Sequence, residues 1–321
     1  MALMNFDHKP VLLEESVSNL KIKPDGVYVD GTLGGAGHST EILKRLGENG
    51  ILIGLDQDEF AIETSLKRLA ALNSRAKVIL ENTNFENIRD VCIKNGIESV
   101  DGILLDIGVS SHQLDETERG FSYNKNAPLD MRMDRRNELN AKTIVNEYSF
   151  EEIRDIVKNY GEERWASRIA EFIVRARETR PIEMTEDLVE IIKAAIPESA
   201  RRKGPHPAKR TFQALRIAVN DELGVLKRAI DEGIELLKQD GRFCIITFQS
   251  LEDRIVKNEF NKRVNPCTCP GEFPVCICGK KPTARLVVRK PIIPSEREIE
   301  DNPRSRSAKL RVLEKFNIYT N

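Results

Sequence analysis

The sequence lacks a long apolar run, an excess of one charge and an export signal. No stretch approaches the roughly 18 consecutive apolar residues that a membrane-spanning helix requires, and residues 1–9 contain no signal-peptide core. We therefore expect a cytoplasmic protein with no membrane partner. Lysine and arginine total 50 against 51 aspartate and glutamate, for a formal net charge of -1. A nucleic-acid partner would therefore have to bind a local basic patch.

What the chain does contain is an alternation of apolar runs and helical patterns in its first third. Four runs have the character of buried strands, at residues 27–30, 51–56, 78–80 and 103–106, with helical stretches near 36–47, 58–72 and 85–95. This alternation predicts a parallel sheet covered by helices on both faces. Three of the runs end in an aspartate, at Asp30, Asp56 and Asp106, and ligands bind at the carboxyl ends of such strands.

A long interval separates the fourth strand from the next convincing one, at residues 242–248. A structureless connection of that length is improbable, and the interval contains apolar stripes at helical spacing, the first behind a capping box formed by Ser149 and Glu152. We predict a discontinuous sheet domain, residues 1–112 and 213–321, with an inserted helical substrate-recognition domain at 113–212. A long helix near 217–238 then returns to the sheet, and further strands are expected at 286–288 and 310–313.

The loop from Asp30 to His38 has four glycines within seven residues, which permit positive φ angles and a close approach of ligand to backbone. Its pattern, acid-Gly-x-x-Gly-Gly-x-Gly, does not match the dinucleotide fingerprint G-x-G-x-x-G, which disfavours a nucleotide-dependent dehydrogenase. A carboxylate at the strand end suits an ammonium and a sulfonium, which points to S-adenosyl-L-methionine. Asp56 stands where an acid binds ribose hydroxyls in nucleoside-binding α/β folds.

Longer motifs follow in a fixed order along nearly the whole chain. They are HKPVL at 8–12, GHS at 37–39, DGILLDIGVSSHQLD at 101–115, ERGFS at 118–122, PLDMRMD at 128–134, RTFQALRI at 210–217, SLEDRIVK at 250–257 and NPRSRS at 302–307. Together they resemble the bacterial RsmH (MraW) family of small-subunit ribosomal RNA cytosine-N4 methyltransferases. The resemblance implies a Rossmann-like class I methyltransferase sheet with an inserted small all-helical domain. It also implies methylation of one cytidine of 16S ribosomal RNA, near the decoding region.

The resemblance implies a set of cofactor contacts as well. These are Ala36, Gly37 and His38 in the loop, Asp56 at the ribose, Phe85 near the adenine, and Asp106 and Gln113 beside the methionine end. The sequence leaves open whether the substrate is free ribosomal RNA or the assembled small subunit. It also leaves open whether the chain forms a homodimer.

One position departs from the family, which has histidine where this chain has Gln249. Glutamine forms hydrogen bonds but does not titrate, so we favour a positioning role there. The departure also supports an alternative, a non-catalytic RNA-binding ribosome assembly factor that retains the fold. The intact acids argue against that alternative.

Methylation of cytosine N4 needs an acceptor for an N4 hydrogen, because the amine lone pair is delocalised into the ring. We assign this role or that of cofactor anchor to Asp106, with Ser110 and Ser111 to orient the base. An unpaired or flipped-out base needs a stacking partner, for which Phe121, Tyr123 and Phe248 are candidates, although each can equally be a core residue.

Basic residues are concentrated in the predicted insertion. Two groups stand out, Arg201, Arg202, Lys203, Lys209 and Arg210 beside His206, and Arg164, Arg168, Arg175, Arg177 and Arg180. Charge runs are often only solvated faces, but here we favour contact with RNA phosphates.

Four of the six cysteines form two pairs, Cys267-Thr-Cys269 and Cys276-Ile-Cys278, around a Pro270-Gly271 turn. Four thiolates could bind zinc, yet zinc sites more often have two residues between the members of a pair. Reduced cysteines without metal are the preferred interpretation, and no metal ligand is assigned. Cys92 and Cys244 lie in apolar stretches and are expected to be buried thiols.

Overall fold

The structure, a computed structural model, describes residues 10–108, 119–202, 204–270, 272–273 and 275–316. The chain divides into two compact units. The sheet unit comprises Met1–Gly108 and Leu223–Asn321, and the helical unit comprises Val109–Glu222. Each unit is described by itself.

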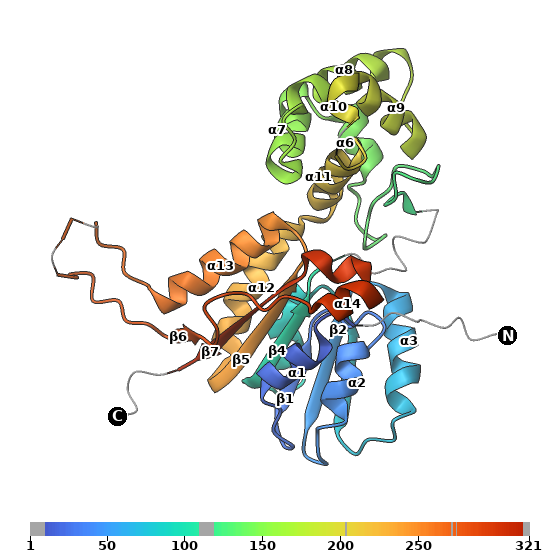
Figure 1. The fold of residues 1–321 in the computed structure, drawn as a ribbon. Coiled ribbons are helices and arrows are strands. Elements are labelled where there is room, and N and C mark those ends of the chain that lie inside the picture. Colours follow the sequence, from blue (N-terminus) through green and yellow to red (C-terminus); the bar gives the residue numbers. More distant parts are fainter. Residues whose placement is uncertain (1–9, 109–118, 203, 271, 274, 317–321) are drawn as a thin grey trace. The chain divides into compact units, whose positions relative to one another are not determined.

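The sheet unit contains a seven-stranded sheet with the order β3-β2-β1-β4-β5-β7-β6 (Figure 1). Its strands are β1 (Val27–Asp30), β2 (Ile51–Asp56), β3 (Lys77–Asn82), β4 (Val100–Asp106), β5 (Leu237–Thr247), β6 (Ala284–Leu286) and β7 (Lys309–Lys315). The first five strands in this order run parallel, while β7 is antiparallel to both β5 and β6. The predicted parallel sheet is confirmed, and its strand order is that of the Rossmann-like methyltransferase class.

Helices cover both faces of this sheet (Figure 1). They are α1 (Leu13–Leu20), α2 (Gly37–Leu43), α3 (Glu59–Ala70), α4 (Ile88–Lys94), α12 (Glu222–Leu236), α13 (Ser250–Val264) and α14 (Glu296–Asp301), with the short η1 (Phe85–Asn87) and η3 (Pro303–Ser307). Side chains of neighbouring strand residues point to opposite faces. Val29 accordingly belongs to a cluster with residues of α4, α12 and α13, whereas Tyr28 belongs to another with residues of α1 and α2.

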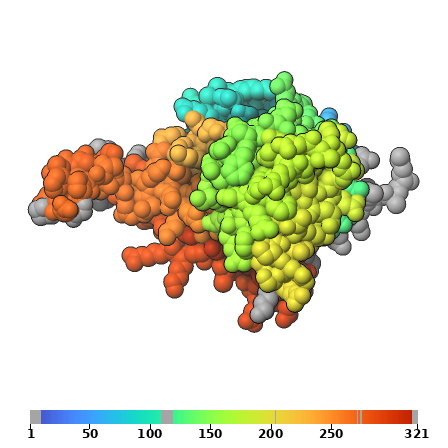
Figure 2. Space-filling model, turned by 90° about the horizontal axis from the view of Figure 1, so that it is seen from above, coloured from blue at the N-terminus to red at the C-terminus, as the bar shows by residue number. Residues whose placement is uncertain are grey.

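The helical unit consists of α6 (Ala141–Glu147), α7 (Phe150–Gly161), α8 (Ala166–Thr179), α9 (Thr185–Ala195), α10 (Glu198–Arg201) and α11 (Lys209–Asn220). The predicted capping box at the start of α7 is present, since Ser149 and Glu152 each accept the backbone N–H of the other. The apolar stripes of α7, α8 and α9 face one common core, which contains Ile153, Ile169 and Ile192. Figure 2 looks onto the close-packed surface of these helices, coloured green to yellow.

The boundary between the units differs from the prediction. The sequence placed it after residue 212 and expected one helix near 217–238. Instead, α11 packs on α6 and α7 and contributes Phe212, Leu215 and Val219 to the helical core. The helix ends at Asn220, the following residue Asp221 has a left-handed conformation with φ of 45°, and α12 begins at Glu222. The sequence did not show this break, because the apolar period of α11 continues into α12 across Asp221.

None of the helices in the described ranges has the length and apolar character needed to cross a membrane.

Replacement of Phe243 by alanine should destabilise the sheet unit strongly. This ring is fully buried in β5, where it lies 6.1 Å from the ring of Phe260. Large-to-small changes of this kind cost about 3–5 kcal/mol. Urea unfolding should show this loss for Phe243→Ala and a much smaller one for the control Phe60→Ala, whose side chain is 40% exposed. Equal losses in the two variants would contradict the assignment of β5 to the core.

Candidate functional site

The glycine-rich loop is held by the strands on both sides of β1. The backbone N–H of Gly31 donates to the carbonyl oxygen of Leu104 in β4 at 2.9 Å, and that of Leu33 donates to Leu55 in β2 at 3.0 Å. Ala36, the last residue before α2, has a φ of 56°. A non-glycine residue rarely adopts this conformation, and such residues cluster at ligand sites. The loop is therefore rigidly placed at the carboxyl edge of the sheet.

Two of the loop glycines make close approaches that a side chain would block. A Cβ atom on Gly31 would lie 2.4 Å from Leu105 and 3.0 Å from Cβ of Phe85. A Cβ atom on Gly37 would lie 2.1 Å from Cγ of Pro10. Phe85, the half-buried first residue of η1, thus stands beside the start of the loop. Its expected contact with an adenine remains a prediction.

Asp56 ends β2 and is tied to the loop by hydrogen bonds. Its carboxylate accepts the backbone N–H of Gly34 at 2.8 Å and that of Asp58 at 2.9 Å. Burial raises its pKa from 3.8 to about 6 in spite of these bonds. The structure thus places Asp56 at the edge that the sequence indicated, whereas its contact with ribose remains a prediction.

Asp106 and Asp30 end the neighbouring strands β4 and β1. Asp30 is buried and accepts the hydroxyl of Ser39 at 2.7 Å and the N–H of Thr32 at 3.2 Å. The backbone N–H of Asp106 donates to the hydroxyl of Thr32 at 2.6 Å. The side-chain atom Oδ1 of Asp106 is buried and accepts no hydrogen bond from any described residue. It is an acceptor left available for a ligand.

A third carboxylate, Glu252 in the first turn of α13, belongs to the same cluster. It is buried, and its Oε2 accepts the backbone N–H groups of Phe248 at 2.9 Å and Gln249 at 3.1 Å. The negative charges of Asp30 and Glu252 both act on Asp106. We refer to Asp30, Asp106 and Glu252 as the acidic cluster.

Asp30 and Asp106 are not neutralised by a basic side chain of the described part of the chain. No lysine or arginine there forms an ion pair with Asp30, Asp56 or Asp106; His38 is the neighbour that lies within range, with Nδ1 3.9 Å from Oδ2 of Asp106. Burial and, to a smaller extent, the charges of Asp30 and Glu252 raise the pKa of Asp106 from 3.8 to about 7. A site of this kind favours a cationic ligand.

His38 lies in the first turn of α2 and is buried. Its Nε2 is 3.1 Å from the carbonyl oxygen of Val11, which can only accept, so Nε2 carries a proton. The ring is thereby fixed with its other nitrogen directed at Asp106. His38 therefore stands between the N-terminal segment and the acidic cluster.

Other residues named from the sequence have different outcomes. Ser110, Ser111 and Gln113 lie outside the described residues. The sequence did not assign Thr32, Ser39 or Glu252 to the site. Thr32 and Ser39 donate hydrogen bonds to Asp30, and the charge of Glu252 acts on Asp106. Glu252 lies within the SLEDRIVK motif, which was the available signal. Gln249 directly precedes α13, and its backbone N–H holds Glu252 in place.

The stacking candidates are engaged in packing. Phe121 is buried in the core of the helical unit. Tyr123 stacks on His206 with ring centroids 4.6 Å apart and meets Phe212 edge-on. Phe248 is half-buried and would lie 3.4 Å from a Cβ atom at Gly108. Phe248 is thus the one of the three that stands beside the strand ends of the sheet unit.

The predicted basic groups divide into paired and unpaired side chains. Arg175, Arg180 and Arg202 form ion pairs with Glu171, Asp187 and Glu198, respectively, and Arg177 donates to the carbonyl oxygen of Val145. Arg210 likewise donates to the carbonyl oxygen of Glu162 at 3.0 Å. Among the described residues no carboxylate pairs with Arg164, Arg168, Arg201, Lys209 or Arg210, which are all exposed. Lys203 lies outside the described residues.

Two of the unpaired arginines lie over aromatic rings. Arg164 lies 5.4 Å from the ring centroid of Trp165, and Arg168 lies 5.4 Å from that of Phe172. Stacking holds their guanidinium groups in place while leaving all donors available. We call Arg164 and Arg168 the arginine platform.

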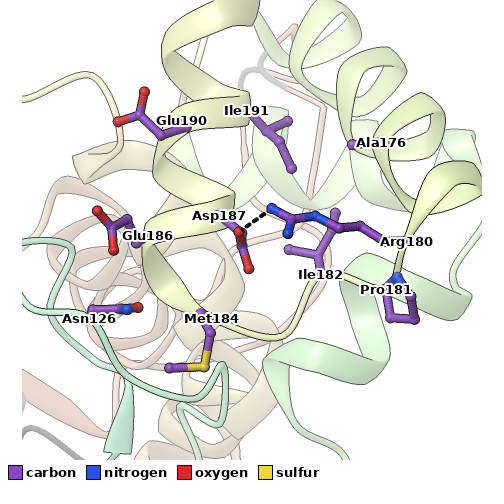
Figure 3. A pocket seen from close by; sticks show the side chains of 10 residues that line it. All are labelled: Asn126, Ala176, Arg180, Pro181, Ile182, Met184, Glu186, Asp187, Glu190 and Ile191. Carbon is purple, nitrogen blue, oxygen red and sulfur yellow. Dashed lines mark hydrogen bonds and ion pairs between the residues drawn. The ribbon is translucent and has the colours of Figure 1, made fainter.

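A hollow of about 430 Å³ lies within the helical unit, between α8 and α9 (Figure 3). Its lining contains Glu186, Asp187 and Glu190, and its arginine, Arg180, is paired with Asp187 at 2.6 Å. An acidic lining of this kind does not suit a phosphate group.

Comparison with known proteins gives an assignment that agrees with this site. The model of the MraW methylase family matches residues 5–316. The chain belongs to the MraW methylase family. It is therefore a methyltransferase, as the motifs predicted.

Named relatives are similar over nearly their whole length. The ribosomal RNA small subunit methyltransferase H of Acetivibrio thermocellus is 74% identical over 313 residues, which cover 98% of this chain and 100% of that protein. The protein of the same name from Clostridioides difficile is 57% identical with the same coverage. A solved rRNA methylase from Streptococcus thermophilus is 12% identical, with a TM-score of 0.43 over 98% of this chain and 100% of that one. This last likeness is too weak to bear on function.

Replacement of Asp106 by asparagine should change how the stability of the unliganded chain depends on pH. The raised pKa means that the folded state retains a proton that the unfolded state has lost between about pH 4 and pH 7. The contribution of Asp106 to folding is therefore most favourable below that window and declines as pH rises through it. Relative to Asp106→Asn, the free energy of unfolding of the natural chain should fall across the window by at most about 4 kcal/mol.

The control is Asp101→Asn at the other end of β4. Although burial acts to raise the pKa of Asp101, hydrogen bonds from Lys238 and Lys23 lower it below its usual range. Urea unfolding at a series of pH values measures both differences. Relative to Asp101→Asn, the free energy of unfolding of the natural chain should not decline above about pH 4. A flat profile for Asp106 as well would contradict the uncompensated burial of its charge.

Proposed function

We propose that this chain transfers a methyl group from S-adenosyl-L-methionine to the exocyclic N4 of one cytidine of small-subunit ribosomal RNA, near the decoding region. Membership of the methylase family and the names of the relatives support ribosomal RNA as the substrate class. Cytosine N4 and the decoding region rest on the resemblance of the motifs alone. The observation that carries the chemistry is the acidic cluster beside the glycine-rich loop.

The residues present fit S-adenosylmethionine, whose sulfonium and ammonium groups are cationic. Asp30 and Asp106 lack a lysine or arginine partner within the described chain, and Oδ1 of Asp106 has no hydrogen-bond donor there. When bound, this cofactor supplies an activated methyl group. Ala36, Gly37 and His38 would hold its methionine end with Asp106, while Asp56 would bind the ribose and Phe85 would pack near the adenine. Ser110, Ser111 and Gln113 keep their proposed roles.

Asp106 is the residue that we assign to the proton of the reacting amine. As the N4 lone pair forms the new carbon–nitrogen bond, the pair of the broken carbon–sulfur bond stays on sulfur, and N4 must lose one proton. The uncommitted Oδ1 of Asp106 can accept an N4 hydrogen in its ionised form. Neutralisation of the cluster by a cationic ligand lowers the pKa of Asp106 and favours that form.

The helical unit supplies the surface that we assign to RNA. The arginine platform presents two fixed guanidinium groups, and Arg201, Lys209 and Arg210 add exposed charge from the same unit. Guanidinium groups bind phosphate oxygens and stack on unpaired bases. Free ribosomal RNA and the assembled small subunit both offer these groups.

Asp106→Asn should reduce methyl transfer by about 10²–10⁴-fold, since the amide cannot take up the N4 proton. The measurement is mass-spectrometric mapping of small-subunit RNA after reaction with the purified chain and labelled cofactor, starting from RNA of a strain that lacks the enzyme. Asp90→Asn, an exposed change on α4, serves as the control and should keep full activity.

Cofactor titration of the same variants separates the two roles of Asp106. A variant that binds the cofactor but does not transfer supports the acceptor role, and loss of binding supports the anchor role. Full turnover by Asp106→Asn would refute both. Cofactor binding by the natural chain without any methylated cytidine would favour the assembly-factor alternative.

Arg164→Ala/Arg168→Ala should weaken RNA binding and reduce its salt dependence. Loss of two phosphate contacts to single-stranded RNA should lower the slope of log affinity against log salt by about 1.4. Filter binding over a salt series measures both quantities. Arg175→Ala/Arg180→Ala, whose charges are already paired, is the matched control and should change the slope little. Equal effects of both double variants would contradict a specific role for the arginine platform.

A further inference from the structure

The segment 265–283, between α13 and β6, has no core of its own. None of its described residues is buried, and none lies in a helix or strand. In Figure 1 this segment, drawn in orange, extends away from the sheet. We call it the cysteine hairpin. Long segments without secondary structure are uncommon in compact proteins, and small elements without a core usually require a disulfide or a metal.

Four thiol groups of this hairpin meet at one point. The Sγ atom of Cys276 lies 3.4 Å from those of Cys267 and Cys278 and 3.8 Å from that of Cys269. Cys278 and Cys267 are 3.9 Å apart, and all four sulfurs lie within 4.8 Å of one another. Disulfide bonds are excluded at these distances, since they require about 2.05 Å. The thiols are therefore free and gathered.

These distances are those of a tetrahedral metal site. Zinc binds thiolate sulfur at about 2.3 Å, which places the four sulfurs of a regular tetrahedron about 3.8 Å apart. Four sulfur ligands in tetrahedral geometry select zinc or iron. All four positions are filled by protein, which is the arrangement of structural rather than catalytic zinc.

The one-residue spacing within each pair also has an explanation in the structure. In an extended chain, side chains two residues apart point to the same side. Cys276 and Cys278 can thus face the other pair while the intervening Ile277 points outward, and Ile277 is 74% exposed. Its backbone N–H lies 3.4 Å from the sulfur of Cys269 as a donor, a contact that favours a thiolate. A turn at Pro270, whose carbonyl accepts the N–H of Phe273, separates the pairs.

We propose that the cysteine hairpin binds one structural zinc ion through four thiolates, those of Cys267, Cys269, Cys276 and Cys278. Each thiol loses its proton to solvent on binding, and no electron is transferred. The ion closes the hairpin in place of an apolar core. The methyl transfer chemistry does not require it.

The first test is the metal content of the full-length chain, purified under reducing conditions and measured by inductively coupled plasma mass spectrometry. We expect one zinc ion per chain, and its loss in Cys267→Ser/Cys276→Ser. Cys92→Ala is the control, because Cys92 is buried in the core of the sheet unit, and it should keep the ion. No stoichiometric metal, one iron ion in place of zinc, or zinc retained by the double variant would each overturn the proposal.

Cobalt binding and proteolysis of the natural chain test the proposal even if the double variant does not fold. Cobalt added to metal-stripped natural chain should give the thiolate charge-transfer and ligand-field bands of a tetrahedral sulfur site; bands of octahedral cobalt would overturn the proposal. Trypsin should cut after Lys280 faster once zinc is removed, and unchanged cleavage would contradict a role in closing the hairpin. Far-ultraviolet circular dichroism should not differ between the double variant and the natural chain, since none of the four cysteines is buried in the core.

Discussion

The burial of acidic groups at one edge of a parallel sheet is the constraint on which the site depends. Asp30 and Asp106 are brought together because β1 and β4 pair in register, and Glu252 is added by the helix that follows β5. The carboxylate of Asp101, at the other end of β4, is neutralised in the usual way, by ion pairs with Lys23 at 2.9 Å and Lys238 at 2.7 Å. Asp30 and Asp106 have no such partner among the described residues, which disfavours their charge until a cation binds.

The hydrogen bonds around the cluster orient its carboxylates without neutralising them. Thr32 and Ser39 hold Asp30, backbone N–H groups hold Glu252, and Val11 fixes the ring of His38. These groups are neutral, so the negative potential survives while the geometry is fixed. β4 ends at Asp106, and the helical unit follows in the chain from Val109. The strand that ends in Asp106 is thus also the strand after which the helical unit is inserted.

The sequence predicted most of the sheet, because strands ending in an acid and separated by helices have few alternative arrangements. It also indicated Asp56 and Asp106, which follow directly from their positions at strand ends. It did not assign Glu252 to the site, although this residue lies within the SLEDRIVK motif, because its place in the cluster depends on a tertiary contact. The break at Asp221 was missed because α11 and α12 share one apolar period, and only packing on α7 shows that α11 belongs to the helical unit.

The structure around the cysteine pairs changes how their spacing is interpreted. A gap of one residue argues against zinc only if each pair lies in the tight turn that a two-residue gap accompanies. In an extended hairpin the same gap places both thiols of a pair on one side, and the turn lies between the pairs instead. The residues on either side of Cys276 are apolar yet exposed, at 71% for Val275 and 74% for Ile277. Side chains that could have formed a core thus point to solvent, while the sulfurs face one another.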